Sequence, residues 1–98
     1  MGKLNATPAS VRRLEDVPNV GKAVADILRR IGIDAPAGLV GRDPFALYAD
    51  VNAVCGIRSD PCLLDTFIAA TRFMGGEPAR PWWAYTAERK ARLGASQD

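Results

Sequence analysis

The chain contains no histidine and only two cysteines, Cys55 and Cys62, among its 98 residues. Without histidine it lacks the commonest general base of enzyme active sites. Neither a nucleophile-elbow serine nor a phosphate-binding P-loop is present to suggest catalysis. Two cysteines alone also give too few ligands for a structural zinc site. We therefore expect no enzyme, no metal and no cofactor, and we interpret both cysteines as reduced thiols on core faces of helices.

Long apolar runs are also missing, since no stretch approaches the roughly 18 residues of a membrane-spanning helix. The first residues, "MGKLNATPAS", lack the apolar segment of a secretory signal. With 48% hydrophobic and 24% charged residues, the composition is that of an ordinary globular domain. These features predict a small cytoplasmic protein of one domain that does not associate with membranes.

Charge of one sign does not dominate, because 13 basic residues face 11 acidic ones for a net charge of +2. Ten of the basic residues are arginines, which form bidentate contacts with phosphate. Codon usage in a genome rich in arginine and alanine codons explains the same composition. The net charge alone therefore predicts no nucleic-acid partner, and the distribution of the charges matters more.

Helical periodicity is abundant, and no segment of useful length alternates with the two-residue period of a strand. Thr7 and Pro8 are suited to an N-cap and a first helical position, which predicts a short helix that Pro18 ends. A second helix is expected over residues 21–31, with Gly32 after its last turn. Residues 34–41 are too short for more than a single-turn connector.

Two more helices are expected to begin with an aspartate as N-cap and a proline as first residue, at 43–44 and at 60–61. Gly56 should end the first of them. The predicted core face of that helix consists of Leu47, Tyr48, Val51, Val54 and Cys55. The second is apolar around most of its circumference up to residue 74, so it belongs at the centre of the fold.

The stretch "EPARPWWAY" follows, and we expect it to be extended and docked on the domain. A short, mostly charged helix capped by Thr86 comes last. Trp82, Trp83 and Tyr85 either pack on the protein or stack on nucleic-acid bases. The predicted organisation is a flexible N-terminus (1–7), a helical domain (8–75) and a C-terminal extension rich in proline and tryptophan (76–98).

Residues 14–33, "LEDVPNVGKAVADILRRIGI", resemble a helix-hairpin-helix motif. The positions of that pattern are occupied by Pro18, Val20, Gly21, Ala25 and Leu28. Asn19 replaces the usual first glycine, a mild change because asparagine tolerates the left-handed backbone conformation. With "CGIRSD" (55–60) as a degenerate second hairpin, the layout resembles an all-α, tandem helix-hairpin-helix bundle of five helices.

Roughly residues 11–92 are similar to a bacterial family of pathogenicity-locus or mitomycin-resistance-type proteins. The stretches that carry this resemblance are "GRDPFALY", "DPCLLDTFIAA" and "PARPWWAYTAERKA". The biochemical role of that family is poorly defined. The resemblance therefore implies the helical fold, and an accessory role in DNA repair or a related process, without naming an activity.

The hairpin suggests a chemistry for the glycine-lysine pair. A helix N-terminus exposes unpaired N–H groups that bind phosphate oxygens, and a glycine there lets a phosphate approach the backbone. Val20 should point inward, while Lys22 adds a positive charge at the turn. The expected phosphate contacts are Pro18, Asn19, Val20, Gly21 and Lys22, with Arg58 in the second hairpin. Such contacts read the DNA backbone and not the bases.

Two alternatives stay open. The same hairpin also occurs as a tight connection between helices with no ligand, and Arg29 and Arg30 then form a solvated face. The second functional hypothesis is a protein–protein interaction module that docks or dimerises without DNA. Acidic residues set against a basic first half favour it: Asp43, Asp50, Asp60 and Asp65. The preferred nucleic-acid structure, the protein partner and the oligomeric state do not follow from the sequence.

Overall fold

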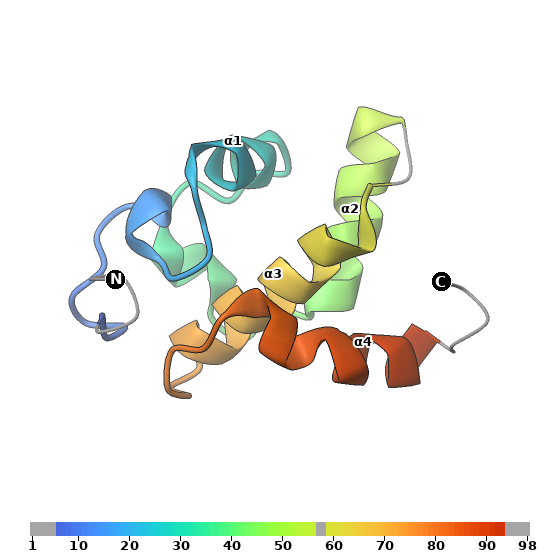
Figure 1. The fold of residues 1–98 in the computed structure, drawn as a ribbon. Coiled ribbons are helices and arrows are strands. Elements are labelled where there is room, and N and C mark those ends of the chain that lie inside the picture. Colours follow the sequence, from blue (N-terminus) through green and yellow to red (C-terminus); the bar gives the residue numbers. More distant parts are fainter. Residues whose placement is uncertain (1–5, 57–58, 94–98) are drawn as a thin grey trace.

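The protein is described from a computed structural model that covers residues 6–56 and 59–93, and this part contains helices and no strands. The α-helices are α1 (Lys22–Arg30), α2 (Pro44–Cys55), α3 (Pro61–Met74) and α4 (Thr86–Leu93) (Figure 1). Short 3₁₀ helices precede or connect them: η2 (Leu14–Asp16), η3 (Pro36–Leu39) and η4 (Trp82–Tyr85). The all-α class predicted from the sequence is confirmed for these residues.

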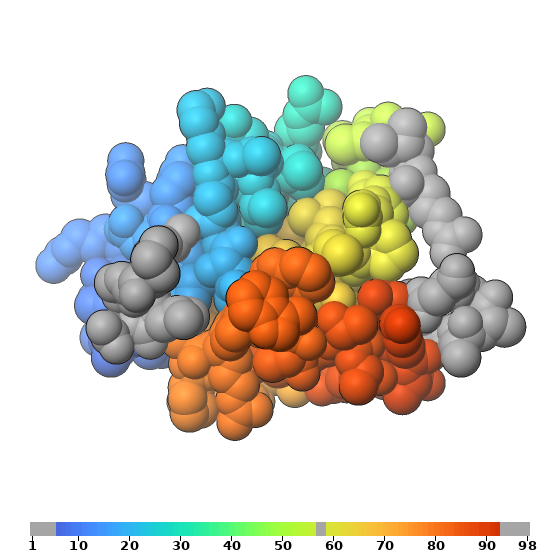
Figure 2. Space-filling model, viewed as in Figure 1, coloured from blue at the N-terminus to red at the C-terminus, as the bar shows by residue number. Residues whose placement is uncertain are grey.

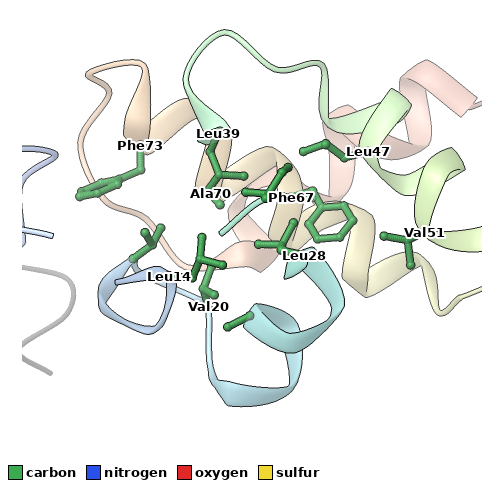
Figure 3. Close-up of a cluster of buried hydrophobic side chains, with 12 residues drawn as sticks. Leu14, Val20, Leu28, Leu39, Leu47, Val51, Phe67, Ala70 and Phe73 are labelled. Carbon is green, nitrogen blue, oxygen red and sulfur yellow. The ribbon is translucent and has the colours of Figure 1, made fainter. Parts of the chain in front are cut away.

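Helix α3 is the centre of the fold, as its apolar circumference predicted. It contacts α2, η3, η4 and α4, and its side chains are buried almost continuously from Leu64 to Thr71. Phe67 is fully buried and lies among Leu28, Leu47 and Val51 (Figure 3). Burying a side chain of this size contributes about 1.5–3 kcal/mol, so α3 organises the core that holds α1 and α2 in place.

The aspartate-proline pairs begin α2 and α3 as expected. A side-chain oxygen of Asp43 accepts a hydrogen bond from the backbone N–H of Phe45 at 2.9 Å, and Asp60 accepts one from Cys62 at 2.8 Å. This hydrogen bond to the carboxylate lowers the pKa of Asp60. Gly56 ends α2 with a φ of 69°, a left-handed conformation that glycine adopts without steric cost.

The expected first helix from residue 8 is wrong. Residues 8–10 form an isolated turn in which the Ser10 hydroxyl and the Thr7 backbone bond to each other, and only η2 follows before the hairpin. The Asp16 carboxylate accepts the backbone N–H groups of Arg12 and Arg13 at 3.1 and 3.0 Å. Short polar side chains thus satisfy the backbone locally, in competition with an α-helix.

Two predicted core positions lie at the surface instead. Val54 is 57% exposed, because the C-terminal end of α2 extends beyond the rest of the core (Figure 1). Cys62 is exposed at the second position of α3, next to the capping Asp60, whereas Cys55 is half-buried and packs against the core. Both thiols are free.

The C-terminal segment packs on α3, but it is not extended throughout. Residues 82–85 form η4, and Tyr85 is buried in a second apolar cluster with Leu64, Ile68 and Ala69. Trp82 is half-buried against the same cluster, whereas Trp83 is 63% exposed. Docking of this segment is therefore confirmed for Tyr85 and Trp82 and wrong for Trp83.

Helix α4 is held by a buried ion pair that the sequence analysis missed. Asp65 on α3 is fully buried, and Arg89 on α4 is 5% exposed. The Arg89 Nε donates to Asp65 Oδ1 at 2.9 Å, and the Thr86 hydroxyl donates to Oδ2 at 2.7 Å. Because α4 continues directly from η4, Thr86 is not the predicted N-cap, and its hydroxyl binds α3 instead.

Candidate nucleic-acid interface

The hairpin at residues 18–22 joins η2 to α1 through one tight turn. Asn19 has a φ of 72°, and among the described non-glycine residues it is the one with a positive φ. The backbone N–H of Val20 donates to the carbonyl of Val17 at 3.0 Å, which closes the turn. Pro18 and Val20 are buried, and Val20 belongs to the main apolar core. The inward-pointing Val20 and the left-handed Asn19 expected from the sequence are both present.

Gly21 is exposed as the N-cap of α1, and nothing inside the protein requires a glycine there. Its φ of −94° and ψ of −172° describe extended backbone that any residue adopts. A Cβ atom built on Gly21 would meet nothing within 4 Å. Serine, aspartate and asparagine stabilise this helix position better than glycine. Glycine here therefore leaves the N-terminus of α1 uncovered at some expense of helix stability.

Helix α1 differs in this respect from α2 and α3, whose N-termini are capped by aspartates. Gly21 offers no side-chain cap, and the first turn of α1 contains no acidic residue. The partial positive charge of the N-terminus is thus not neutralised by the protein's own carboxylates within that turn.

Lys22 adds a full positive charge beside this N-terminus. Its side chain is 85% exposed, and its Nζ lies 3.3 Å from the Asp26 carboxylate one turn further along α1. Asp26 is itself 53% exposed, so water screens the pair and a phosphate can compete for the ammonium group.

The side chain of Asn19 makes contacts that the sequence analysis did not foresee. Its Nδ2 donates to the backbone carbonyl of Arg80 at 2.7 Å, and its Oδ1 accepts the backbone N–H of Trp82 at 3.1 Å. The amide is thus engaged by the C-terminal segment through both its nitrogen and its oxygen. We call these two hydrogen bonds the Asn19 bridge.

The Asn19 bridge brings an additional arginine to the hairpin. Arg80 is exposed, and no ion pair among the described residues involves its guanidinium. In Figure 2 the orange segment that contains residues 80–85 lies against the blue surface of the hairpin region, in agreement with the hydrogen bonds. Nothing near Arg80 in the sequence signals this position, since Asn19 is 61 residues away.

Arg29 is committed to the protein's own carboxylates. Its two Nη atoms lie 2.8 and 3.0 Å from the Glu15 oxygens, and Nη1 lies 3.2 Å from Asp26. The hydrogen bond from Arg29 holds the pKa of Glu15 at about 2, against an ordinary value of 4.5. The ion pair of Glu15 and Arg29 connects η2 to α1, the two helices that flank the hairpin. Arg30 is exposed, as expected for a solvated face.

The segment predicted as a second hairpin is described only in part, and Arg58 lies outside the described residues. Ser59, which follows the undescribed residues, is held by α2: its backbone N–H donates to Asn52 Oδ1 at 2.8 Å, and the Tyr48 hydroxyl donates to its carbonyl. These bonds fix the start of α3 relative to α2.

Across residues 6–56 and 59–93, no three histidine, cysteine, aspartate or glutamate side chains come together as a possible metal site. None of the described helices is long and apolar enough to cross a membrane.

Comparison of the sequence with known proteins assigns this helical chain to a family. The family model described as the Cdd1 pathogenicity locus matches residues 7–91, and the chain belongs to that family. The chain is also similar to the mitomycin resistance protein McrB of Streptomyces lavendulae. The two are 51% identical over 80 residues, which cover 82% of this chain and 76% of that protein. No solved structure matches.

Proposed function

We propose that the chain binds the phosphate backbone of DNA without sequence specificity through the hairpin at residues 18–22. The observation that supports this most is Gly21, which neither backbone conformation nor internal packing requires. A glycine at that place keeps the backbone N–H groups at the start of α1 open to an anion from outside. Lys22 supplies a charge for the same phosphate, and Arg80 supplies one for a neighbouring phosphate.

The proposal includes a tandem helix-hairpin-helix arrangement. In it, η2 and α1 flank the first hairpin, η3 is the connector, and α2 and α3 flank the second. These five helical elements would replace the five helices expected from the sequence, and Arg58 would contribute to the second hairpin. Backbone contacts of this kind suit an accessory role in DNA repair. Because the similar protein of Streptomyces lavendulae is a mitomycin resistance protein, we extend a role in mitomycin resistance to this chain as part of the proposal.

A protein–protein interaction module is the second candidate. The exposed Val54 at the projecting end of α2 favours it. The acidic residues that suggested it are less available than the sequence implied, because Asp65 is buried and Asp43 and Asp60 are bound to backbone N–H groups. DNA binding therefore has the stronger support.

The test is DNA affinity at several salt concentrations for the original chain and for Lys22→Glu. With two or three phosphate contacts, the log–log salt slope for duplex DNA should be about −2 to −3, with a Kd of ~10⁻⁴–10⁻⁶ M at physiological salt. Lys22→Glu should remove most of this affinity. Its stability should change little, because a gain of about 0.3–1 kcal/mol at the helix N-terminus opposes a repulsion from Asp26 of about 0.2–0.5 kcal/mol.

Two further variants sharpen the result. Lys90→Glu makes the same charge change on an exposed position of α4 and should leave most of the affinity. Gly21→Ser should keep or raise stability through a better N-cap, yet weaken DNA binding by covering the backbone. Unchanged DNA affinity in folded Lys22→Glu and Gly21→Ser proteins would overturn the proposal in favour of the interaction module.

A further inference from the structure

We propose that the exposed indole of Trp83 stacks on an unpaired base, so that the preferred substrate is single-stranded DNA. This inference rests on the proposed function, because it places a base-binding surface beside the phosphate-binding hairpin. It concerns an aromatic side chain that the backbone contacts of the hairpin do not use.

Trp83 is exposed but held in place. Trp83 is 63% exposed as a residue, whereas Tyr85 two residues later is buried and fixes η4 on α3. The neighbouring Trp82 is half-buried and meets the Trp83 ring edge to face, with the ring centroids 5.5 Å apart. A rigid aromatic side chain with few rotatable bonds loses little conformational entropy when a ligand covers it.

The Asn19 bridge determines where this indole lies. Asn19 binds the backbone N–H of Trp82, the residue directly before Trp83, and Gly21 follows Asn19 by two residues. Standard bond lengths along this path limit the separation of the Gly21 and Trp83 Cα atoms to about 18 Å. A stacked single strand rises about 3.4 Å per nucleotide, so some five nucleotides or fewer span the distance. That length fits the site sizes of modules that bind single strands.

The charges near the indole favour a nucleic acid over an apolar protein surface. Lys22 follows Asn19 by three residues. The exposed Arg80 is part of the Asn19 bridge, because its backbone carbonyl accepts one of the two hydrogen bonds. Proteins that bind single strands combine basic groups that follow the phosphates with aromatic side chains on which bases stack. Among residues 6–56 and 59–92, the other large exposed apolar side chains, Val40 and Val54, are aliphatic and cannot stack on a base.

Duplex DNA cannot use this surface in the same way. The faces of its bases are already stacked on each other inside the helix, so only a base that has left the stack can lie against an indole. Trp83 should therefore contribute to the binding of single strands and leave the binding of duplexes unaffected, while Lys22 contributes to both.

The experiment compares Trp83→Ala, Trp83→Phe and Lys22→Glu by fluorescence anisotropy at low salt. The probes are a labelled oligodeoxythymidine of about 12 nucleotides and a duplex of equal length. Trp83→Ala should weaken binding of the single strand by about 5- to 150-fold and leave the duplex affinity unchanged. Trp83→Phe should keep most of the single-strand affinity. Val54→Ala is the matched control, because it removes an exposed apolar side chain elsewhere.

The outcomes separate this inference from the proposed function. Loss of duplex binding in Lys22→Glu with no effect of Trp83→Ala on either probe overturns the stacking site and leaves the hairpin site standing. An equal loss for both probes in Trp83→Ala also overturns it, since Trp83 would then only support the hairpin. A changed oligomeric state in Trp83→Ala, with DNA affinity unaltered, would make this face a contact between copies of the chain. No binding of either DNA by the original chain would overturn both proposals.

Discussion

At the scale of single residues, Asn19 has two functions that depend on different parts of it. Its backbone adopts the left-handed conformation that the tight turn needs, with a φ of 72°. Its side chain binds the C-terminal segment through Arg80 and Trp82. A glycine, which the helix-hairpin-helix pattern usually has there, would satisfy the first requirement and not the second. Asparagine at this position therefore serves both the turn and the docking of the C-terminal segment.

Asn19→Gly and Asn19→Ala should separate these two functions. Asn19→Gly keeps the positive φ and loses two hydrogen bonds, each worth about 0.5–1.5 kcal/mol. Asn19→Ala loses the same bonds and adds a left-handed strain of about 1–2 kcal/mol. Urea unfolding should thus rank the original chain above Asn19→Gly and Asn19→Gly above Asn19→Ala. Equal stabilities of the glycine variant and the original chain would show that the Asn19 bridge does not stabilise the fold.

Glu15 should make the stability of the folded protein depend on pH in the acid range. Its pKa is about 2 in the folded protein against an ordinary 4.5, chiefly because Arg29 hydrogen-bonds to it. A lowered folded pKa contributes stability that is complete above pH 4.5 and is lost as the pH falls toward 2. Thermal melts should therefore show the original chain above Glu15→Gln at neutral pH, with the difference in Tm shrinking toward pH 2.

Arg29→Met is the partner variant. Because it removes the hydrogen bond that lowers the pKa of Glu15, the stability of this variant should depend less on pH between 4.5 and 2. Asp16, whose pKa is also lowered by backbone N–H groups, leaves a residual slope in all these proteins. For this reason the difference between variants, and not the slope of one protein, is the informative quantity. A Tm difference between the original chain and Glu15→Gln that stays constant down to pH 2 would contradict the assignment.

At the scale of helices, α4 depends on the buried pair of Asp65 and Arg89. Arg89→Met leaves a buried carboxylate without its cation, which typically costs about 3–5 kcal/mol. Replacing both partners by apolar residues, Asp65→Leu with Arg89→Met, removes the unpaired charge and should recover most of that loss. Urea unfolding of the two single variants and the double variant gives the coupling directly. A double variant no more stable than Arg89→Met would show that the pair is not the dominant contact of α4.

At the scale of the whole molecule, what could be predicted depended on distance along the chain. The aspartate caps and Gly56 involve partners only a few residues apart, so the local pattern showed them. Within the hairpin, the inward orientation of Val20 and the left-handed backbone of Asn19 could also be predicted from the local sequence. The pattern failed at the first helix, because local hydrogen bonds outweighed its helical periodicity: the Ser10 hydroxyl donates to the Thr7 carbonyl, and the Asp16 carboxylate accepts the Arg12 backbone N–H.

Contacts between distant segments could not be read in this way. Asp65 and Arg89 are 24 positions apart, and Asn19 and Arg80 are 61 apart. A charged residue on a polar helix and a lone arginine among prolines give no local sign of such partners. The sequence therefore predicted the residues of the hairpin as part of the candidate site, but it did not predict Arg80.

The two tryptophans should report separately on the docking of the C-terminal segment. Trp82→Phe leaves the exposed Trp83, which should emit at a wavelength close to that of an indole in water. Trp83→Phe leaves the half-buried Trp82, whose emission should be blue-shifted and less open to acrylamide quenching. On urea unfolding, the Trp82 signal should change together with the helical circular dichroism, because η4 packs on α3. A separate, earlier Trp82 transition would mean that the segment detaches on its own.

The Asn19 bridge also sets an order of events during synthesis on the ribosome. Asn19 leaves the exit tunnel long before its partners, since Arg80 and Trp82 are added 61 and 63 positions later. At roughly 5–20 residues per second, the asparagine side chain waits about 3–12 s for them. During that interval the nascent chain already carries its glycine-lysine turn, but the arginine and the tryptophan that complete the surface do not yet exist. The aromatic half of the proposed interface is thus the last to be assembled, and a chain that stops before residue 80 would never acquire it.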